Sequence, residues 1–154
     1  MNRLHQELLK DFQVFGQNAP KVADGAYRLS TAREMTKYNW VGFYLVDPAD
    51  PGILLVGSFV GNFTPNARIP LDKGLCGAAA KSGQVVVVHD VHTDSRYLSG
   101  SAMVKSEIVV PIIAKKMLVA ELDIESYFVS TFTKAEQEFV EACAGLVGKY
   151  LASA

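Results

Sequence analysis

Two short segments of the sequence carry aromatic and acidic side chains at a spacing that could bind a small molecule. In the first segment, Trp40, Gly42 and Tyr44 alternate with apolar residues, so all three share one face of a predicted strand. A glycine between two large rings predicts a gap for a ligand, with ring faces available to a cation. The pattern leaves an alternative open, in which both rings simply pack beneath a loop.

The second segment carries acids at strand spacing. Glu121, Asp123 and Glu125 share one face because they alternate with Leu122 and Ile124. Taken alone, the alternation favours an exposed strand of a sheet with one solvated face. The alternative is a set of carboxylates that face a pocket and bind an ammonium group or protonate a leaving oxygen. Crowding would raise their pKa values, which suits an acid role.

Three further residues carry reactive or charged groups next to apolar segments. Glu107 precedes the apolar run IVVPII, where it is either solvated or directed into a cavity under the preceding loop. Cys76 lies between glycines in GLCGAAA at the start of a short helix, a position that lowers the pKa of a thiol. It could instead be a small buried residue of an Ala-rich helix. Cys143 lies on the apolar stripe of the last predicted helix, so we expect it in the core.

The remaining motifs exclude several kinds of site. The chain has three histidines, and they lack metal-site spacing with carboxylates, so we expect no metal ion. The segment DKGLCG lacks the GK[ST] of a phosphate-binding loop. The sequence contains no evidence for a haem, bilin or cyclic-nucleotide site, and we expect no cofactor.

The periodicity of the chain predicts an α+β fold. Two helices are expected before residue 36, one through Leu4 to Phe15 and one from about Pro20 to Met35. An Ala-rich helix ends at Gly83, and a last helix runs from about Thr133 to Leu151. The predicted strands are Asn39–Val46, Ile53–Val60, Val85–Val88, Glu107–Ile113 and Lys116–Ile124. This order predicts an antiparallel sheet with the N- and C-terminal helices on one face and a ligand pocket on the other.

Length and charge narrow the function classes. A chain of 154 residues without a linker predicts a single domain over residues 1–154. A net charge of −1 offers no basic surplus for nucleic acid or an anionic membrane. The longest apolar run is too short to span a bilayer and no signal-peptide core is present, so we expect a cytoplasmic protein. Two cysteines do not imply a disulfide framework.

Five segments resemble the GAF domains of the free methionine-(R)-sulfoxide reductase family: NWVGFYLV, ARIPLDKGLCGAAA, the central DVH, KSEIVVPI and ELDIES. The resemblance implies a GAF fold with a pocket for free methionine sulfoxide. It implies that Trp40 and Tyr44 form an aromatic wall around the sulfoxide methyl group. It also implies that Glu107, Asp123 and Glu125 hold the sulfoxide oxygen and the amino group. The family usually has Asp at the position of Glu125.

The cysteines depart from the family pattern. The resemblance puts Gly100 at the position of the family's nucleophilic cysteine and Asn66 at that of its resolving cysteine. Cys76 matches an auxiliary cysteine and is the only family cysteine retained. The family reaction needs a thiolate that becomes a sulfenic acid and a second thiol that resolves it. Neither Ser99 nor Ser101 is a good substitute for such a thiol.

Three hypotheses follow from this combination. The first is a GAF domain that binds methionine sulfoxide or a related amino acid without the catalytic cycle. The second is an active reductase that uses Cys76, with an external thiol such as glutathione or thioredoxin resolving the sulfenic acid. The third is an interaction scaffold, in which terminal helices pair into a homodimer. A shared fold does not separate these functions.

Overall fold

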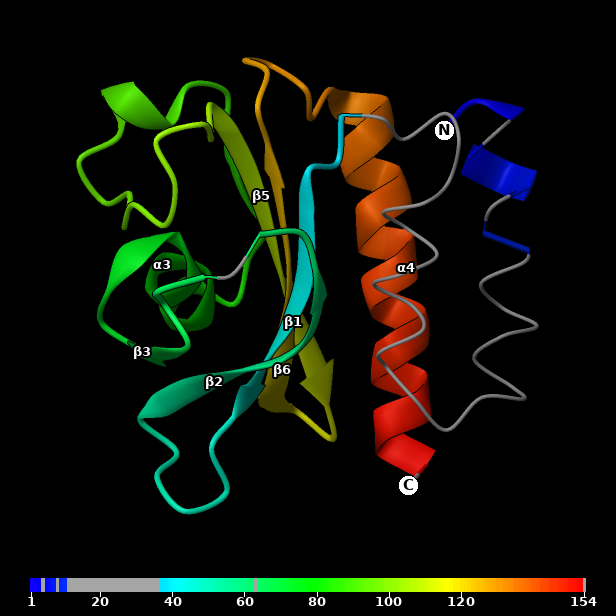
Figure 1. Ribbon diagram of the computed structural model, residues 1–154. Coiled ribbons are helices and arrows are strands. Elements are labelled where there is room, and N and C mark those ends of the chain that lie inside the picture. Colours follow the sequence, from blue (N-terminus) through cyan, green and yellow to red (C-terminus); the bar gives the residue numbers. More distant parts are fainter. Residues whose placement is uncertain (4, 8, 11–36, 63, 154) are drawn as a thin grey trace.

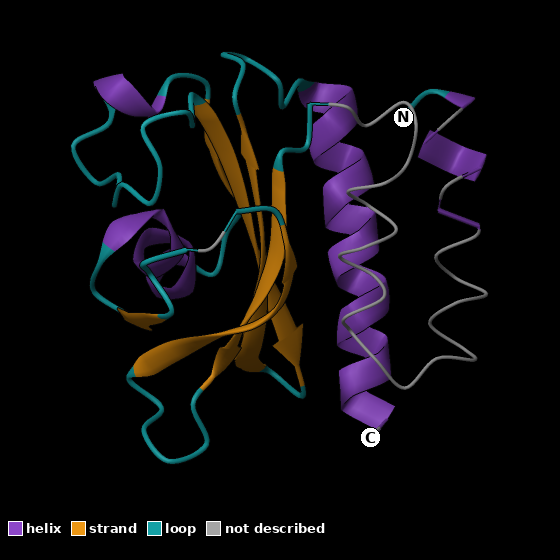
Figure 2. Cartoon of the chain, viewed as in Figure 1, coloured by secondary structure: helices purple, strands orange, loops and turns teal. Residues whose placement is uncertain are grey.

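The computed structural model describes residues 1–153 except positions 4, 8, 11–36 and 63. A six-stranded antiparallel sheet with the order β3-β2-β1-β6-β5-β4 forms its centre. One long helix covers one face of this sheet, and a short helix with loops covers the other (Figures 1 and 2). The strands are β1 Trp40–Val46, β2 Ile53–Val60, β3 Arg68–Pro70, β4 Val86–Val88, β5 Ser106–Ala114 and β6 Met117–Ser126; the helices are α3 Gly74–Ser82, the 3-10 turn η1 Val91–Thr93, and α4 Lys134–Ser153.

The arrangement confirms the predicted α+β fold. The four long strands lie within two residues of their predicted bounds, and α3 ends at Ser82 with Gly83 as its C-cap. Gly83 adopts a φ of 66°, a left-handed conformation in which glycine carries no steric penalty. The second predicted helix, from Pro20 to Met35, lies outside the described residues.

The apolar core fills the space between the sheet and α4. Alternate strand residues such as Val41, Phe43 and Leu122 face α4 and are fully buried. Cys143 of α4 is also fully buried in this cluster, which confirms its predicted core position. The other residues predicted for the buried face of this helix are not all fully buried. Phe139, Val140 and Val147 are buried, whereas Leu146 and Tyr150 are half-buried.

The described N-terminal residues pack on the outer side of α4, on the same side of the sheet (Figure 1). Residues 3, 5–7, 9 and 10 are helical. The His5 ring stacks on Phe139 with 4.8 Å between centroids, and the N-terminal ammonium group lies 2.9 Å from Glu138. Both terminal segments therefore lie on one face, as predicted, and the opposite face is left for α3 and the loops. Among the described residues, no helix is long and apolar enough to cross a membrane.

Strand order decides where the predicted acids lie. β6 sits between β1 and β5, so it is a central strand. The exposed strand that the alternation alone favoured is therefore wrong, and the alternative of acids that face a pocket agrees with this position. Its acids face α3: Glu125 pairs with Trp40 and Asp123 with Gly42 across β1. On the other side Glu125 pairs with Glu107 of β5. Directly paired residues share a face, so the aromatic and the acidic sets meet on one surface.

Candidate functional site

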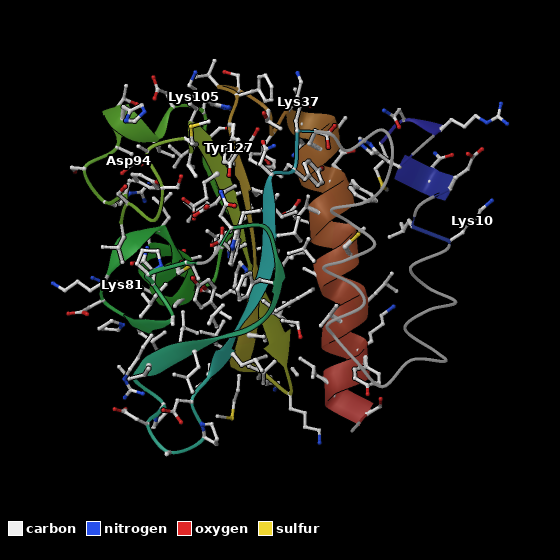
Figure 3. The ribbon with its side chains drawn as sticks, viewed as in Figure 1. Lys10, Lys37, Lys81, Asp94, Lys105 and Tyr127 are labelled. Carbon is white, nitrogen blue, oxygen red and sulfur yellow. The ribbon has the colours of Figure 1, made fainter. Side chains whose placement is uncertain are left out.

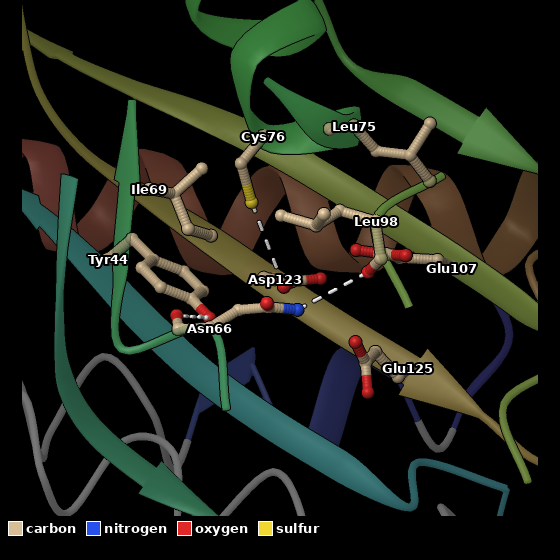
Figure 4. Close-up of a pocket in the computed structure, with 10 residues that line it drawn as sticks. Tyr44, Asn66, Ile69, Leu75, Cys76, Leu98, Glu107, Asp123 and Glu125 are labelled. Atoms are coloured by element: carbon tan, nitrogen blue, oxygen red, sulfur yellow. Dashed lines mark hydrogen bonds between the residues drawn. The ribbon is translucent and has the colours of Figure 1, made fainter. Parts of the chain in front are cut away.

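A small pocket lies between the sheet and the α3 side of the molecule (Figure 4). Its lining residues come from β1, β3, β5, β6, α3 and the loops before β3 and β5. The enclosed space is about 20 Å³, which is room for about one water molecule. Its lining residues are Tyr44, Asn66, Ile69, Gly74, Leu75, Cys76, Leu98, Glu107, Asp123 and Glu125.

Four acids are withdrawn from water on this side of the sheet. Glu107 is 5% exposed, Asp123 is 3% exposed and Glu121 is fully buried, while Glu125 is half-buried. Burial raises the pKa of Glu121 to about 9 and that of Glu125 to about 8. The pKa of Asp123 rises to about 7 through burial, and hydrogen bonds from Glu107 and Cys76 oppose the rise. Burial, followed by the neighbouring carboxylates, raises the pKa of Glu107 well above its usual range.

No basic side chain balances this group of acids within the pocket. Among the described residues that line it, none is Lys, Arg or His. Lys81 and Lys105 are exposed, and Figure 3 shows both at the outside of the molecule. Uncompensated carboxyls in a dry site hold their protons until a cation enters. The pocket is therefore suited to a positively charged group.

Cys76 contributes its thiol to the same pocket. Its Sγ lies 3.8 Å from Asp123 Oδ2 (Figure 4). Burial raises the pKa of this thiol, and the Asp123, Glu121 and Glu107 carboxyls raise it further. The expected lowering by the helix N-terminus is thus outweighed, because desolvation and negative neighbours both disfavour a thiolate. Cys76 therefore lies in the site, but its surroundings do not stabilise the reactive thiolate.

Trp40 and Tyr44 are packed against each other, without the open gap between them that the sequence predicted. Trp40 and Tyr44 are both buried, with 6.0 Å between ring centroids. A Cβ at Gly42 would lie 2.2 Å from the Trp40 ring, so the indole fills the predicted gap above the glycine. Trp40 also stacks on Phe59 and donates its Nε1–H to the Asn62 carbonyl at 3.1 Å. Tyr44 lines the pocket, whereas Trp40 is not among the lining residues.

Two loops meet at the mouth of the pocket. Asn66 donates its side-chain N–H to the Leu98 carbonyl at 3.3 Å, and Tyr44 donates its hydroxyl to the Asn66 carbonyl at 2.9 Å. A Cβ at Gly100 would lie 3.4 Å from Asn66 Nδ2. Positions 66 and 100 are therefore neighbours, although neither carries a thiol here.

Several site residues were missed in the sequence: Ile69, Gly74 and Leu75 line the pocket without having been predicted, and two more lie in the loop before β5. Leu98 lines the pocket, and Tyr97 lies beside the acids, since burial and then Glu125 and Glu107 raise the pKa of its hydroxyl. The signal that could have found them is an aromatic and an aliphatic residue together inside the otherwise polar segment HTDSRYLSGS. Such residues in a loop indicate a contact with the body of the fold.

Comparison with known proteins agrees with this architecture. The sequence profile of the GAF domain family matches residues 28–151. Free methionine-R-sulfoxide reductase of Escherichia coli is 33% identical over 119 residues, which are 77% of this chain and 70% of that protein. The reductase of the same name from Saccharomyces cerevisiae is 34% identical over 72% of this chain and 62% of its own length.

A solved structure of a reductase with the same name has a similar fold. Free methionine-R-sulfoxide reductase of Neisseria meningitidis, in complex with its substrate, superposes with a TM-score of 0.88 and 28% identity. The match covers 97% of this chain and 90% of that one. The chain therefore belongs to the GAF domain family and is homologous to the free methionine-R-sulfoxide reductases.

Proposed function

We propose that this chain is a GAF domain that binds free methionine sulfoxide, or a closely related amino acid, without completing a reductase cycle. One observation carries the proposal. The pocket keeps Tyr44, Glu107, Asp123 and Glu125, whereas the paired positions 66 and 100 at its mouth carry no thiol.

The acids supply the binding part of this function. An ammonium group entering among Glu107, Asp123 and Glu125 favours the ionised carboxylates and donates charge-assisted hydrogen bonds to them in a water-poor site. A space of about 20 Å³ is too small for an amino acid. Binding therefore requires the loop at Leu98, which lines the pocket, to move outward. The Asn66–Leu98 hydrogen bond that closes the mouth contributes only about 1 kcal/mol.

The absence of thiols at positions 66 and 100 is the reason why we expect no reductase turnover. In thiol-dependent reduction the nucleophilic sulfur takes the sulfoxide oxygen as a sulfenic acid, and the substrate leaves as a thioether. A second thiol then forms a disulfide and releases that oxygen as water. Gly100 has no side chain for the first step, and Asn66 cannot perform the second. The raised pKa of Cys76 keeps its thiol protonated at neutral pH.

The test separates binding from turnover. Purified protein is mixed with methionine-(R)-sulfoxide and dithiothreitol, methionine formation is followed, and thermal unfolding is measured with and without the sulfoxide. We expect no methionine and a rise in the unfolding temperature that is lost in Glu107→Gln. The control Asp72→Asn changes an exposed acid outside the pocket and should keep the rise. Absence of both turnover and a thermal shift would refute the pocket as a sulfoxide site.

A second candidate function rests on the position of Cys76. Its Sγ lies inside the acid cluster, 3.8 Å from a carboxyl that could deliver a proton. With a reductant such as glutathione or thioredoxin, an active reductase would form methionine, and Cys76→Ser would abolish that activity. Cys143→Ser removes the other buried thiol from the opposite core and is the matched control.

A further inference from the structure

We propose that Cys76, Glu107 and Asp123 form a site for a divalent transition-metal ion such as Zn²⁺. Within the described part of the chain, one ligand atom from each of these residues lies within 4.8 Å of the other two, and all three residues are buried. This proposal does not depend on the proposed function, because it concerns an inorganic ligand and needs neither sulfoxide binding nor catalysis.

The three ligands are delivered by three packed elements. Cys76 projects from the first turn of α3, Glu107 from the start of β5 and Asp123 from the middle of β6. The Sγ–Oδ2 distance between Cys76 and Asp123 is 3.8 Å. Bond lengths of about 2.0–2.3 Å separate the ligand atoms of a tetrahedral zinc site by about 3.5 Å. A small contraction of the cluster would therefore bring the three atoms to zinc distances.

Unpaired polar atoms point independently to a missing positive partner. Asp123 is 3% exposed and lines the pocket, yet its Oδ1 has no hydrogen-bond partner. Both oxygens of the fully buried Glu121 also lack a partner. Buried polar atoms are almost always paired, and carboxylates in the interior are normally balanced by a cation or a metal. The lining contains no basic side chain that could serve.

The donor set indicates which kind of ion fits. Thiolate sulfur favours Zn²⁺, Co²⁺ or Fe²⁺ over the hard ions Mg²⁺ and Ca²⁺, which prefer oxygen alone. On binding, the Cys76 thiol and those of the Glu107 and Asp123 carboxyls that are protonated release their protons to solvent as the metal–ligand bonds form. Three protein ligands leave a fourth position for water, as in open zinc sites. Because Glu107 and Asp123 would also hold an ammonium group, metal and amino acid should exclude one another.

The test uses Co²⁺ as a spectroscopic probe and Zn²⁺ as its competitor. Untagged, chelator-treated protein is titrated with Co²⁺, and thiolate-to-cobalt charge transfer is followed in the near ultraviolet. We expect one equivalent of Co²⁺ to produce the band and Zn²⁺ to remove it. Cys76→Ser should abolish the band, and Asp123→Asn should weaken Co²⁺ affinity at least tenfold.

Cys143→Ser keeps the test decisive even if Cys76→Ser fails to fold. This variant leaves Cys76 as the only thiol of the chain, so a charge-transfer band in it must come from Cys76. Absence of the band in Cys143→Ser, or its persistence in folded Cys76→Ser, overturns the site. Adding methionine sulfoxide then separates the two proposals. Co²⁺ binding without any sulfoxide effect refutes only the amino-acid ligand, and a sulfoxide thermal shift without Co²⁺ binding refutes only the metal site.

Discussion

The substitution Gly42→Ala tests how the aromatic wall is packed. An added Cβ would lie 2.2 Å from Trp40 Cη2 and 2.6 Å from Cζ3, far inside contact distance. The indole therefore has to move by more than an ångström. It is confined by Phe59, with 5.5 Å between ring centroids, and by its hydrogen bond to Asn62. The methyl group thus strains a packed ring rather than filling a cavity.

The expected loss of stability is the sum of two costs of displacing the indole. Overpacking of a well-packed core costs about 1–3 kcal/mol, and loss of the indole hydrogen bond costs about 1 kcal/mol. We therefore expect a loss of about 2–4 kcal/mol in the free energy of unfolding. For a domain of this size that corresponds to a fall of about 4–16 °C in the unfolding temperature.

The assay is urea unfolding followed by fluorescence, because Trp40 is the chain's only tryptophan. The control Gly145→Ala adds a methyl group on α4 with no atom within 4 Å. It should stabilise the chain by up to about 1 kcal/mol through helix propensity. In a Trp40→Ala background the methyl at residue 42 has room, so Gly42→Ala should there cost almost nothing. Unfolding in that background is followed by far-ultraviolet circular dichroism, because the chain then has no tryptophan. Equal costs in the two backgrounds would refute the inferred position of the indole.

Three further changes test other parts of the structure. Phe139→Ala opens a cavity in the core under α4 and should lower the free energy of unfolding by about 3–5 kcal/mol in urea titrations. The Ala49 N–H, with help from Arg68, lowers the pKa of Asp47. Its stabilising effect is therefore present above the unfolded-state pKa and lost as pH falls through the folded-state pKa; Asp47→Asn should destabilise the chain at pH 7 but not in acid below both pKa values. Combining Asn66→Cys with Gly100→Cys should give a disulfide on mild oxidation, detected by free-thiol titration, because the two positions are neighbours. Free thiols that persist under oxidant would count against that geometry.

Local periodicity was enough to predict the strands, because alternation of apolar and polar residues depends only on neighbouring positions. It also predicted that Glu121, Asp123 and Glu125 share a face. It could not predict that this face is buried, since that depends on β6 lying between β1 and β5, a long-range pairing. The alternation taken alone therefore favoured the wrong environment for all three acids.

Side-chain conformation was the second feature that the sequence could not predict. The spacing of Trp40 and Gly42 indicated an opening above the glycine, but the indole rotates into that space. Which rotamer a tryptophan adopts depends on contacts such as Phe59 and Asn62, which lie elsewhere in the chain. The proximity of Asn66 and Gly100 likewise joins two loops that no local pattern connects.

The Asn66–Leu98 contact also affects how quickly the pocket mouth can respond. Loop motions that break a neutral hydrogen bond take nanoseconds to microseconds, whereas uncatalysed disulfide rearrangement takes minutes to hours. A mouth held by an amide and a carbonyl reopens by thermal motion and consumes no electrons. If the proposed ligand binds there, its entry and exit would be limited by this loop motion rather than by thiol–disulfide exchange.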